Sequence, residues 1–224
     1  MLIHPAEARR RFIEFAETDI THENLAEGAL LIALEDYPRL DLNGYLDELN
    51  ALAVRVEKRC QRREPDIFRL GHLHAEMFDA ADAYRGDTQS YYDPRNAYLN
   101  EVIDRKLGIP ITLAIVFLHV ASKIGLNASG VGLPGHYLVK VQFELNEVYV
   151  DPFHSGQTLT VPEIGALLKQ LSGGATTLSS EHLRAWSGRE TLHRVLANLV
   201  SMWSRAGDTR RAHSARERME LLAE

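Results

Sequence analysis

The stretch GHYLVKVQFELNEVYVDPF, residues 135–153, decides the fold more than any other part of the chain. Its apolar positions alternate with other residues and are Tyr137, Val139, Val141 and Phe143, then Val148 and Val150. Since successive residues of a strand point to opposite faces, this alternation predicts two strands joined as a hairpin. A hairpin that buries its apolar face would place His136 and Asp151 together on the other, more polar face. A carboxylate in that position can fix the tautomer and orientation of an imidazole, so we predict that His136 and Asp151 form a catalytic-type dyad, as a remnant without an obvious nucleophile.

Strand register decides whether the two side chains meet. A tight turn at residues 145–146 would offset them by four residues, whereas a turn nearer residues 143–144, or a bulge, would place them opposite each other. Each residue also has an interpretation without a functional site. His136 can be a surface or core histidine that bonds to the backbone, and Asp151, which precedes Pro152, can simply cap a turn.

Length and composition exclude several classes of protein. The 224 residues suit one large domain, or one domain with a helical appendage. The N-terminus has no apolar signal region, and the longest apolar run, residues 113–120, is too short to span a bilayer. Cys60 is the only cysteine, which excludes a disulfide framework and a thiolate metal cluster. We therefore expect a cytoplasmic protein without a membrane partner.

Charge is uneven along the chain. Residues 182–224 hold eight arginines and five acidic residues, a local charge of +3. The arginines alternate with glutamates on amphipathic helices and no stripe of stacking aromatics accompanies them, so we interpret them as a solvated face rather than a nucleic-acid site.

Helices are predicted on both sides of the hairpin. Asp41 and Pro65 are typical of helix starts among the mainly helical residues 1–88. A helix from Arg95 to about Lys106 precedes a second one over residues 111–124, which Gly125 ends. That second helix, ITLAIVFLHVASKI, is apolar on nearly every side, so we expect it to be the core helix on which the sheet packs.

The C-terminal residues predict two further helices, divided at Gly207-Asp208, within residues 181–224. They are similar to one tetratricopeptide-type pair, a motif that needs stacked neighbours to bury its apolar face. We therefore expect this pair to pack, as an appendage, on the main domain of residues 1–180.

The order of buried helix, strand with histidine and strand with aspartate resembles the transglutaminase-like, papain-related superfamily. YYDPRNAYLNEVIDRKLGIPITLAIVFLHVASKIGL, GVGLPGHYLVKV and VDPFHSG are similar to its SirB-type branch, and the similarity covers about residues 20–160. The resemblance implies an α+β fold with a buried central helix on a small antiparallel sheet. It also implies a cysteine at the start of the central helix, fifteen residues before a closing glycine, activated by the histidine.

Counting back fifteen residues from Gly125 gives Pro110, which has no nucleophilic side-chain atom. The cysteine mechanism of the superfamily therefore cannot operate at that position. Thr112 is the nearest hydroxyl, although a threonine there also commonly closes its own helix turn. Cys60 is far away in sequence, at the end of a predicted helix.

Further candidate residues follow from the same resemblance. Tyr92, Asn96 and Asn100, with Pro110, are expected near the groove, where an amide could stabilise an oxyanion or instead tie its loop to backbone groups. His154, three residues after Asp151, suggests a metal with the dyad, but no second strong ligand set supports one, so we expect no metal. No Gly-rich phosphate loop precedes a helix, so no cofactor is expected.

The sequence therefore predicts a transglutaminase-like protein without its nucleophile, which binds a protein or peptide in the former active-site groove. The alternatives are a hydrolase or acyltransferase that uses His136 and Asp151 with water or Thr112, and a structural scaffold for the C-terminal helices. The oligomeric state stays open.

Overall fold

The predicted hairpin lies at the centre of a four-stranded antiparallel sheet in the computed structural model, which describes residues 2–223. Neighbouring strands follow chain order: β3 (Ala128–Leu133), β4 (His136–Gln142), β5 (Glu147–Asp151) and β6 (Gln157–Leu159). Val139 pairs with Val150, and the backbone of Phe143 bonds to that of Asn146, so residues 144–145 form the turn. This register lies between the two that the sequence left open. Continued by one step, it sets Asp151 beside Leu138, diagonally across from His136.

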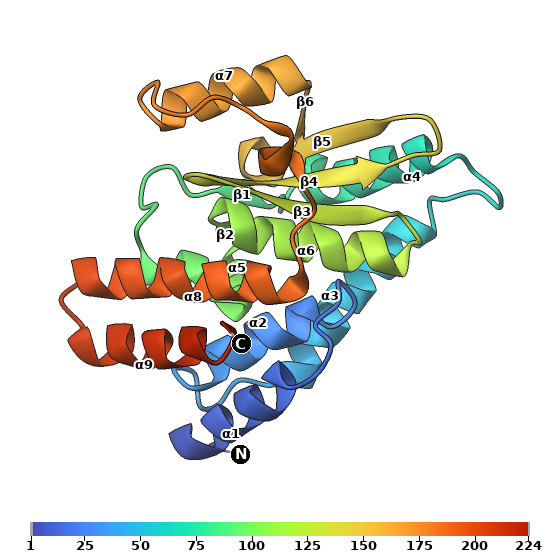
Figure 1. The fold of residues 1–224 in the computed structure, drawn as a ribbon. Helices are drawn as coiled ribbons and strands as arrows, with labels where there is room; N and C mark the ends of the chain where they lie inside the picture. Colours follow the sequence, from blue (N-terminus) through green and yellow to red (C-terminus); the bar gives the residue numbers. More distant parts are fainter. Residues whose placement is uncertain (1, 224) are drawn as a thin grey trace.

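The sheet lies between two helices, α6 (Pro110–Lys123) on one face and α7 (Val161–Leu171) on the other (Figure 1). The face toward α6 carries the expected alternating residues Tyr137, Val139, Val141 and Val150. The opposite face is less polar than the sequence predicts, because Leu138 and Tyr149 pack there against Ile164 of the amphipathic helix α7. The polar pair His136 and Asp151 is therefore confined to one end of that face.

Helix α6 is the buried core helix that the sequence predicts. Pro110 occupies its first turn, where a missing N–H costs nothing. Gly125 follows the end of the helix with a positive φ, a conformation that glycine adopts without strain. Every residue from Pro110 to Ala121 is buried. The helix is thus a fixed support for the elements on both of its sides.

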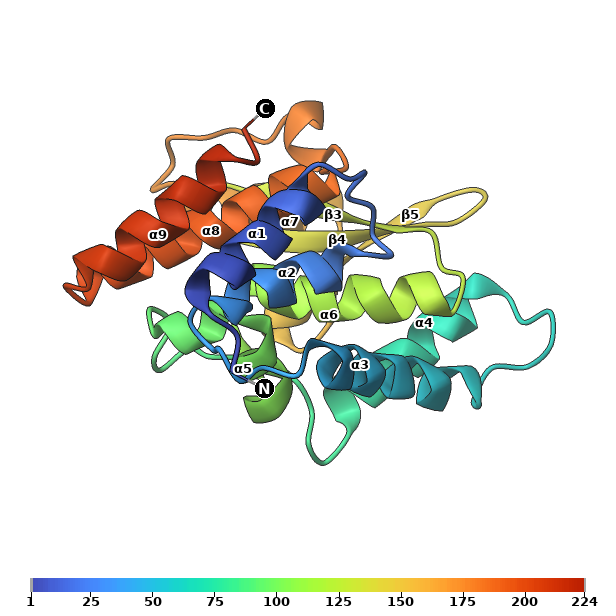
Figure 2. The same cartoon turned by 90° about the horizontal axis from the view of Figure 1, so that it is seen from below.

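Helices cover the side of α6 that faces away from the sheet (Figure 2). Helices α2 (Leu25–Leu34) and α3 (Leu42–Glu57) pack on α6, and α1 (Pro5–Ala16) packs on α2. Helix α4 (Asp66–His74) lies instead beside the sheet, near the β4–β5 turn (Figure 1), and a π-helical turn, η1 (Ala75–Asp79), continues it. Asp41 caps α3 through the backbone N–H of Gly44, and Pro65 stands at the N-cap of α4, as expected. This arrangement confirms the α+β class, with a small antiparallel sheet and helices at both ends of the chain.

The single helix expected over residues 95–106 is wrong. Tyr98 adopts an extended backbone and divides the segment into a 3₁₀ turn, η2 (Pro94–Ala97), and a short helix, α5 (Leu99–Arg105). Its hydroxyl donates to Asp36 and accepts from the indole of Trp203, so contacts distant in sequence hold this break. Two short parallel strands, β1 (Arg85–Gly86) and β2 (Leu107–Gly108), flank the segment.

The C-terminal residues form a 3₁₀ turn, η4 (Ser180–Leu183), and two antiparallel helices, α8 (Gly188–Arg205) and α9 (Thr209–Glu220) (Figure 1). Leu192, Leu196 and Leu199 of α8 belong to the same hydrophobic core as α2 and α6. Arg218 of α9 is only 1% exposed, so the interpretation of these arginines as a solvated face is wrong for this residue. A domain boundary at residue 180 stays a prediction.

None of the helices within residues 2–223 combines the length and the hydrophobicity needed to cross a membrane.

Candidate functional site

His136 and Asp151 meet at the end of the sheet nearest the start of α6. His136 begins β4 and Asp151 ends β5, and Nε2 of the imidazole lies 2.7 Å from Oδ2 of the carboxylate. The two residues are 6% and 2% exposed. The structure therefore brings together the pair that strand alternation placed on one face, through a diagonal rather than a direct cross-strand contact.

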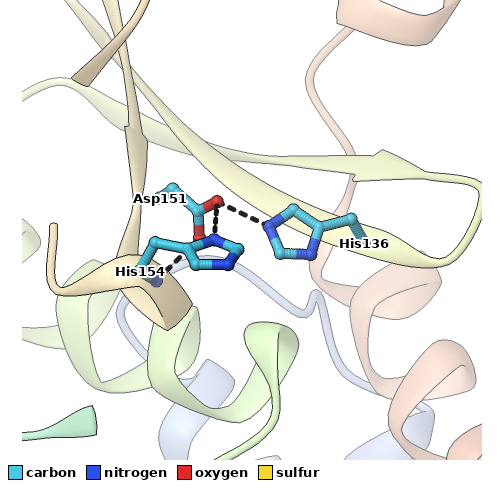
Figure 3. Close-up of side chains that lie close together, drawn as sticks. All are labelled: His136, Asp151 and His154. Carbon is cyan, nitrogen blue, oxygen red and sulfur yellow. Dashed lines mark hydrogen bonds and ion pairs between the residues drawn. The ribbon is translucent and has the colours of Figure 1, made fainter. Parts of the chain in front are cut away.

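The turn after β5 fixes the carboxylate and adds a third group. Pro152 starts a 3₁₀ turn, η3 (Pro152–His154), and Oδ1 of Asp151 accepts the backbone N–H groups of Phe153 and His154. The turn brings the imidazole of His154 back over the strand end, with Nδ1 2.8 Å from Oδ2 of Asp151 (Figure 3). One oxygen of Asp151 is thus used by the backbone, and the other is shared by two imidazoles.

The electrostatics of Asp151 follow from these contacts. Burial alone raises the pKa of its carboxyl group, but the hydrogen bond and charge of His136, followed by those of His154, outweigh burial and hold the pKa below its ordinary value. The carboxylate is therefore kept in its ionised form, which is the form that can orient an imidazole.

The second ring nitrogen of His136 turns away from Asp151 (Figure 3), and Nδ1 has no hydrogen-bond partner within residues 2–223. His136 borders a cavity of about 10 Å³, which has room for about one water molecule. The other residues that line it are Tyr91, Pro110, Ile111, Gly135, Tyr137, Arg194 and Asn198. The start of α6 and one side of α8 thus border this side of His136.

Pro110 lies in this cavity at the position where the superfamily resemblance implies a nucleophile. It is the first residue of α6, and it is buried. A side chain there would benefit from the positive end of the helix dipole, but the proline ring offers only carbon atoms. The described structure therefore contains an orienting carboxylate, an imidazole and a helix N-terminus, without a nucleophilic side chain at their meeting point.

Thr112 has a structural use for its hydroxyl. Its Oγ1 is fully buried, donates to the backbone carbonyl of Asn96 at 2.8 Å and accepts the N–H of Ile109. These bonds close the first turn of α6 and attach it to η2. A hydroxyl held in this way is not free to attack a substrate.

Cys60 lies at the other end of the core helix. It lines a hollow with Lys123 and Ile124, at the C-terminal end of α6, whereas His136 borders Pro110 and Ile111 at the N-terminal end. The full length of the helix therefore separates Cys60 from the dyad. Burial, aided by the nearby charge of Glu64, raises the pKa of this thiol, so Cys60 is neither near the dyad nor activated.

The other predicted binding residues are not gathered at His136. Asn96 is buried and bonds to Asp87, Ser90 and Arg105, which ties its loop together. Asn100 lines a different hollow, beside Tyr37 and Tyr45. Tyr92 is exposed, with the guanidinium of Arg205 stacked 4.2 Å from its ring centre. Of the predicted binding set, the structure places only Pro110 in the cavity with His136.

The sequence indicated His154 beside the dyad, but it did not indicate the neighbours that come from α8. The turn residue Pro152 in VDPFH was a usable signal for His154, because a tight turn returns a residue three positions on toward Asp151. Arg194 and Asn198 line the cavity from α8, and no local pattern connects them with the hairpin.

Hollows larger than the cavity at His136 lie elsewhere, including those beside Cys60 and Asn100. One of about 850 Å³ lies between α1, α2 and the start of α3, and its charged side chains are exposed or half-exposed and of both signs. Another, of about 620 Å³, lies between the start of α4 and the β4–β5 turn. Neither is lined by a buried ionisable side chain, so chemistry favours the smaller cavity at His136.

The central helix, the antiparallel sheet and the histidine–aspartate pair define a class of protein. The family model described as the transglutaminase-like superfamily matches residues 43–197, and this chain belongs to that superfamily. The match extends from α3 into α8, and it includes His136, Asp151 and the cavity residue Arg194.

Particular relatives come from bacteria and animals. The chain is 31% identical over 201 residues to a UPF0162 protein of Xylella fastidiosa, a match that covers 88% of this chain and 71% of the relative. It is 30% identical to a UPF0162 protein of Pseudomonas aeruginosa, over 82% of this chain and 66% of the relative. It is 23% identical to human F-box only protein 21, over 92% of this chain but only 37% of that protein. No solved structure matches the chain.

Proposed function

We propose that this chain is a SirB-type member of the transglutaminase-like superfamily that works as a non-catalytic binding or regulatory module. The observation that carries the proposal is Pro110 in the cavity beside His136, at the start of the buried helix. The orienting pair and the helix N-terminus are retained there, but no side chain within residues 2–223 supplies a nucleophile. The groups that would orient a nucleophile are therefore present, and without the nucleophile the cavity is suited to binding rather than to catalysis.

The size of the cavity limits the class of ligand. A space of about 10 Å³ admits a water molecule or one small polar group, so most of any larger ligand must lie outside it. Arg194, Asn198 and Nδ1 of His136 offer polar groups around it. We infer that the ligand is an extended peptide or protein segment, which inserts one small polar group into the cavity and lies across the surrounding surface. As a separate expectation from the sequence, we propose that the protein works in the cytoplasm.

The binding role is tested with peptides selected from a displayed library on the full chain. Asn198→Trp, which enlarges a half-exposed side chain in the cavity wall, is expected to lower affinity for the selected peptides at least tenfold. Ser201→Trp, on an exposed position of the same helix, is the matched control and should bind as the wild type does. Equal binding by both variants would remove the cavity from the binding surface.

A second experiment tests whether position 110 is a former nucleophile position, by introducing a cysteine there. In a Cys60→Ala background, Pro110→Cys places a thiol at the helix N-terminus beside His136, where both the dipole and the imidazole lower a thiol pKa. Ultraviolet titration of the thiolate is expected to give a pKa well below that of Cys60 in the wild type. Adding His136→Ala should raise it, and an unshifted thiol in the Pro110→Cys variant would show that this is not a former nucleophile position.

A hydrolase that uses water is the second candidate. Two observations favour it. Asp151 bonds to Nε2 of His136 and can orient the imidazole. The other ring nitrogen, Nδ1, has no partner within residues 2–223, and the cavity beside His136 has room for one water molecule. In this case His136 would act as general base, and turnover should disappear with His136→Ala or Asp151→Asn in variants that remain folded. Release of ammonia from glutamine-containing peptides and cleavage of a mixed peptide pool are the measurements. Turnover above the blank, lost in both variants, would overturn the non-catalytic proposal.

A further inference from the structure

His136, Asp151 and His154 form a compact cluster of metal-ligating groups at the end of the sheet (Figure 3). One nitrogen of each imidazole and one carboxylate oxygen lie within 4.8 Å of one another. Both nitrogens contact the same oxygen, Oδ2 of Asp151, at 2.7 and 2.8 Å. Three side chains from β4, β5 and η3 thus direct ligand atoms of a suitable kind at one point.

The backbone holds this cluster in place. Oδ1 of Asp151 accepts two backbone N–H groups, which fixes the plane of the carboxylate and leaves Oδ2 toward the imidazoles. The ring of Phe153 packs edge-on against His136, with centroids 6.0 Å apart. Such outer contacts orient the ligands in protein metal sites and strengthen binding.

The charge of Asp151 also requires a partner. This carboxylate is 2% exposed, and within residues 2–223 its only ion-pair partners are the two imidazoles. Buried charges in proteins are paired or coordinate metals, and no lysine or arginine side chain of the described residues pairs with this one. A cation held between the imidazoles and the carboxylate would satisfy the buried charge without a salt bridge.

We propose that His136 Nε2, His154 Nδ1 and Asp151 Oδ2 bind one divalent transition-metal ion of the Zn²⁺ class. Two imidazoles and a carboxylate suit zinc and its first-row neighbours, whereas Mg²⁺ prefers oxygen ligands. Three protein ligands leave one coordination position for water or for an oxygen of a bound molecule. The proposal goes beyond the binding function above, since the cavity at Pro110 can act with or without a metal.

The present distances are those of hydrogen bonds. Metal bonds of about 2.1 Å set the ligand atoms of a tetrahedral site about 3.4 Å apart, so each imidazole nitrogen must move roughly 0.6–0.7 Å away from Oδ2 of Asp151. The side chain of His154 is 50% exposed and can rotate outward, whereas His136 and Asp151 are enclosed. The same exposure gives a metal ion its path of entry.

The experiment uses the full chain, freed of metal by a chelator and titrated with Zn²⁺ against a chromophoric competitor. One equivalent is expected to bind in the wild type, and Mg²⁺ in large excess should not displace it. His154→Ala and Asp151→Asn are each expected to weaken Zn²⁺ affinity at least tenfold. His213→Ala removes an exposed histidine from α9 and is the matched control, with unchanged affinity expected.

Circular dichroism checks that each variant is folded. His154→Ala should disturb the fold least, because the side chain of His154 is half exposed. The proposal is overturned if the wild type binds no zinc, or if His154→Ala and His213→Ala bind zinc equally. In that outcome the cluster is a metal-free hydrogen-bonded triad, and loss of peptide binding in Asn198→Trp remains a separate test of the binding function.

Discussion

Two clusters of ionisable groups among residues 2–223 differ in the cation that each one uses. At the end of the sheet, Asp151 faces two imidazoles. At the junction of α2 and α9, Glu35 and Asp36 face Arg9, Arg211 and the fully buried Arg218. A guanidinium is always charged, whereas an imidazole can lose its proton and take another role. The arginine cluster is therefore suited to holding elements together, and the histidine cluster to changing its state.

The arginine cluster should carry the larger share of stability. Arg218→Met removes the bond from Nη1 to the carbonyl of Ile32. It also leaves Glu35 with Arg9, and Asp36 with Arg211, as their remaining ion-pair partners. Removing one partner of a buried ion pair costs about 3 kcal/mol. Urea unfolding followed by circular dichroism measures this loss.

Arg216→Ala, which changes an exposed arginine on the same helix, is the matched control for Arg218→Met. A substitution of an exposed side chain without such contacts should cost no more than about 0.5 kcal/mol. Equal effects of the two substitutions would contradict the contrast between the clusters.

Loss of the central carboxylate of the histidine cluster should cost less. Asp151→Ala removes two turn-capping bonds and the partner of His136. Losses of this kind amount to about 2 kcal/mol, and the imidazole left behind can be neutral, which limits the penalty. The same urea experiment measures it, and Asp151→Asn, which keeps an oxygen for the turn, should retain part of the stability. A loss greater than that of Arg218→Met would reverse the ranking.

The contribution of the arginine cluster to stability should decrease as the pH falls. Burial raises the pKa of Glu35, but the hydrogen bond from Arg9, the charge of Arg218 and the hydroxyl of Ser214 outweigh it and lower the pKa below its ordinary value. The contribution of Glu35 is thus fully present above the ordinary glutamate pKa of about 4.3, and disappears as pH falls through the lowered value. Thermal unfolding from neutral to acidic pH should show a steeper loss for wild type than for Glu35→Gln. Parallel curves would exclude Glu35 as the source.

The smallest effect on stability should come from His154. Its side chain is half exposed and contacts Asp151 on only one side. We therefore expect His154→Ala to change the unfolding free energy by less than about 1 kcal/mol. Urea unfolding without added metal is the measurement. A larger loss would give His154 a structural role, like that of Arg218, and would remove the contrast between the clusters.

Much of the fold could be predicted from local patterns. Alternation in residues 135–153 places His136 and Asp151 on one face because side-chain direction in a strand has a period of two. The all-round apolar character of residues 111–124 predicts the buried helix in the same direct way. Helix starts at Asp41 and Pro65 depend on adjacent residues, and they too could be predicted.

The remaining features depend on contacts between distant segments. Tyr98 breaks a helix because its hydroxyl bonds to Asp36 and Trp203, which lie 62 and 105 residues away. Arg218 resembles its exposed neighbours in sequence and is buried only because α9 packs on α2. Arg194 and Asn198 reach the cavity only after α8 has docked, so no motif near the hairpin indicates them.

Helix α8 supplies one wall of the cavity at His136, although it belongs neither to the sheet nor to the central helix. One wall comes from the start of α6, while Arg194 and Asn198 stand opposite on a helix anchored by the bond between Tyr137 and Thr191. Substitutions along α8 can therefore reshape the space around His136 while the strands and the dyad stay as they are. For the proposed binding site, α8 would thus set which ligands fit, while the hairpin would set the orientation of His136, and substitutions could change the first without the second.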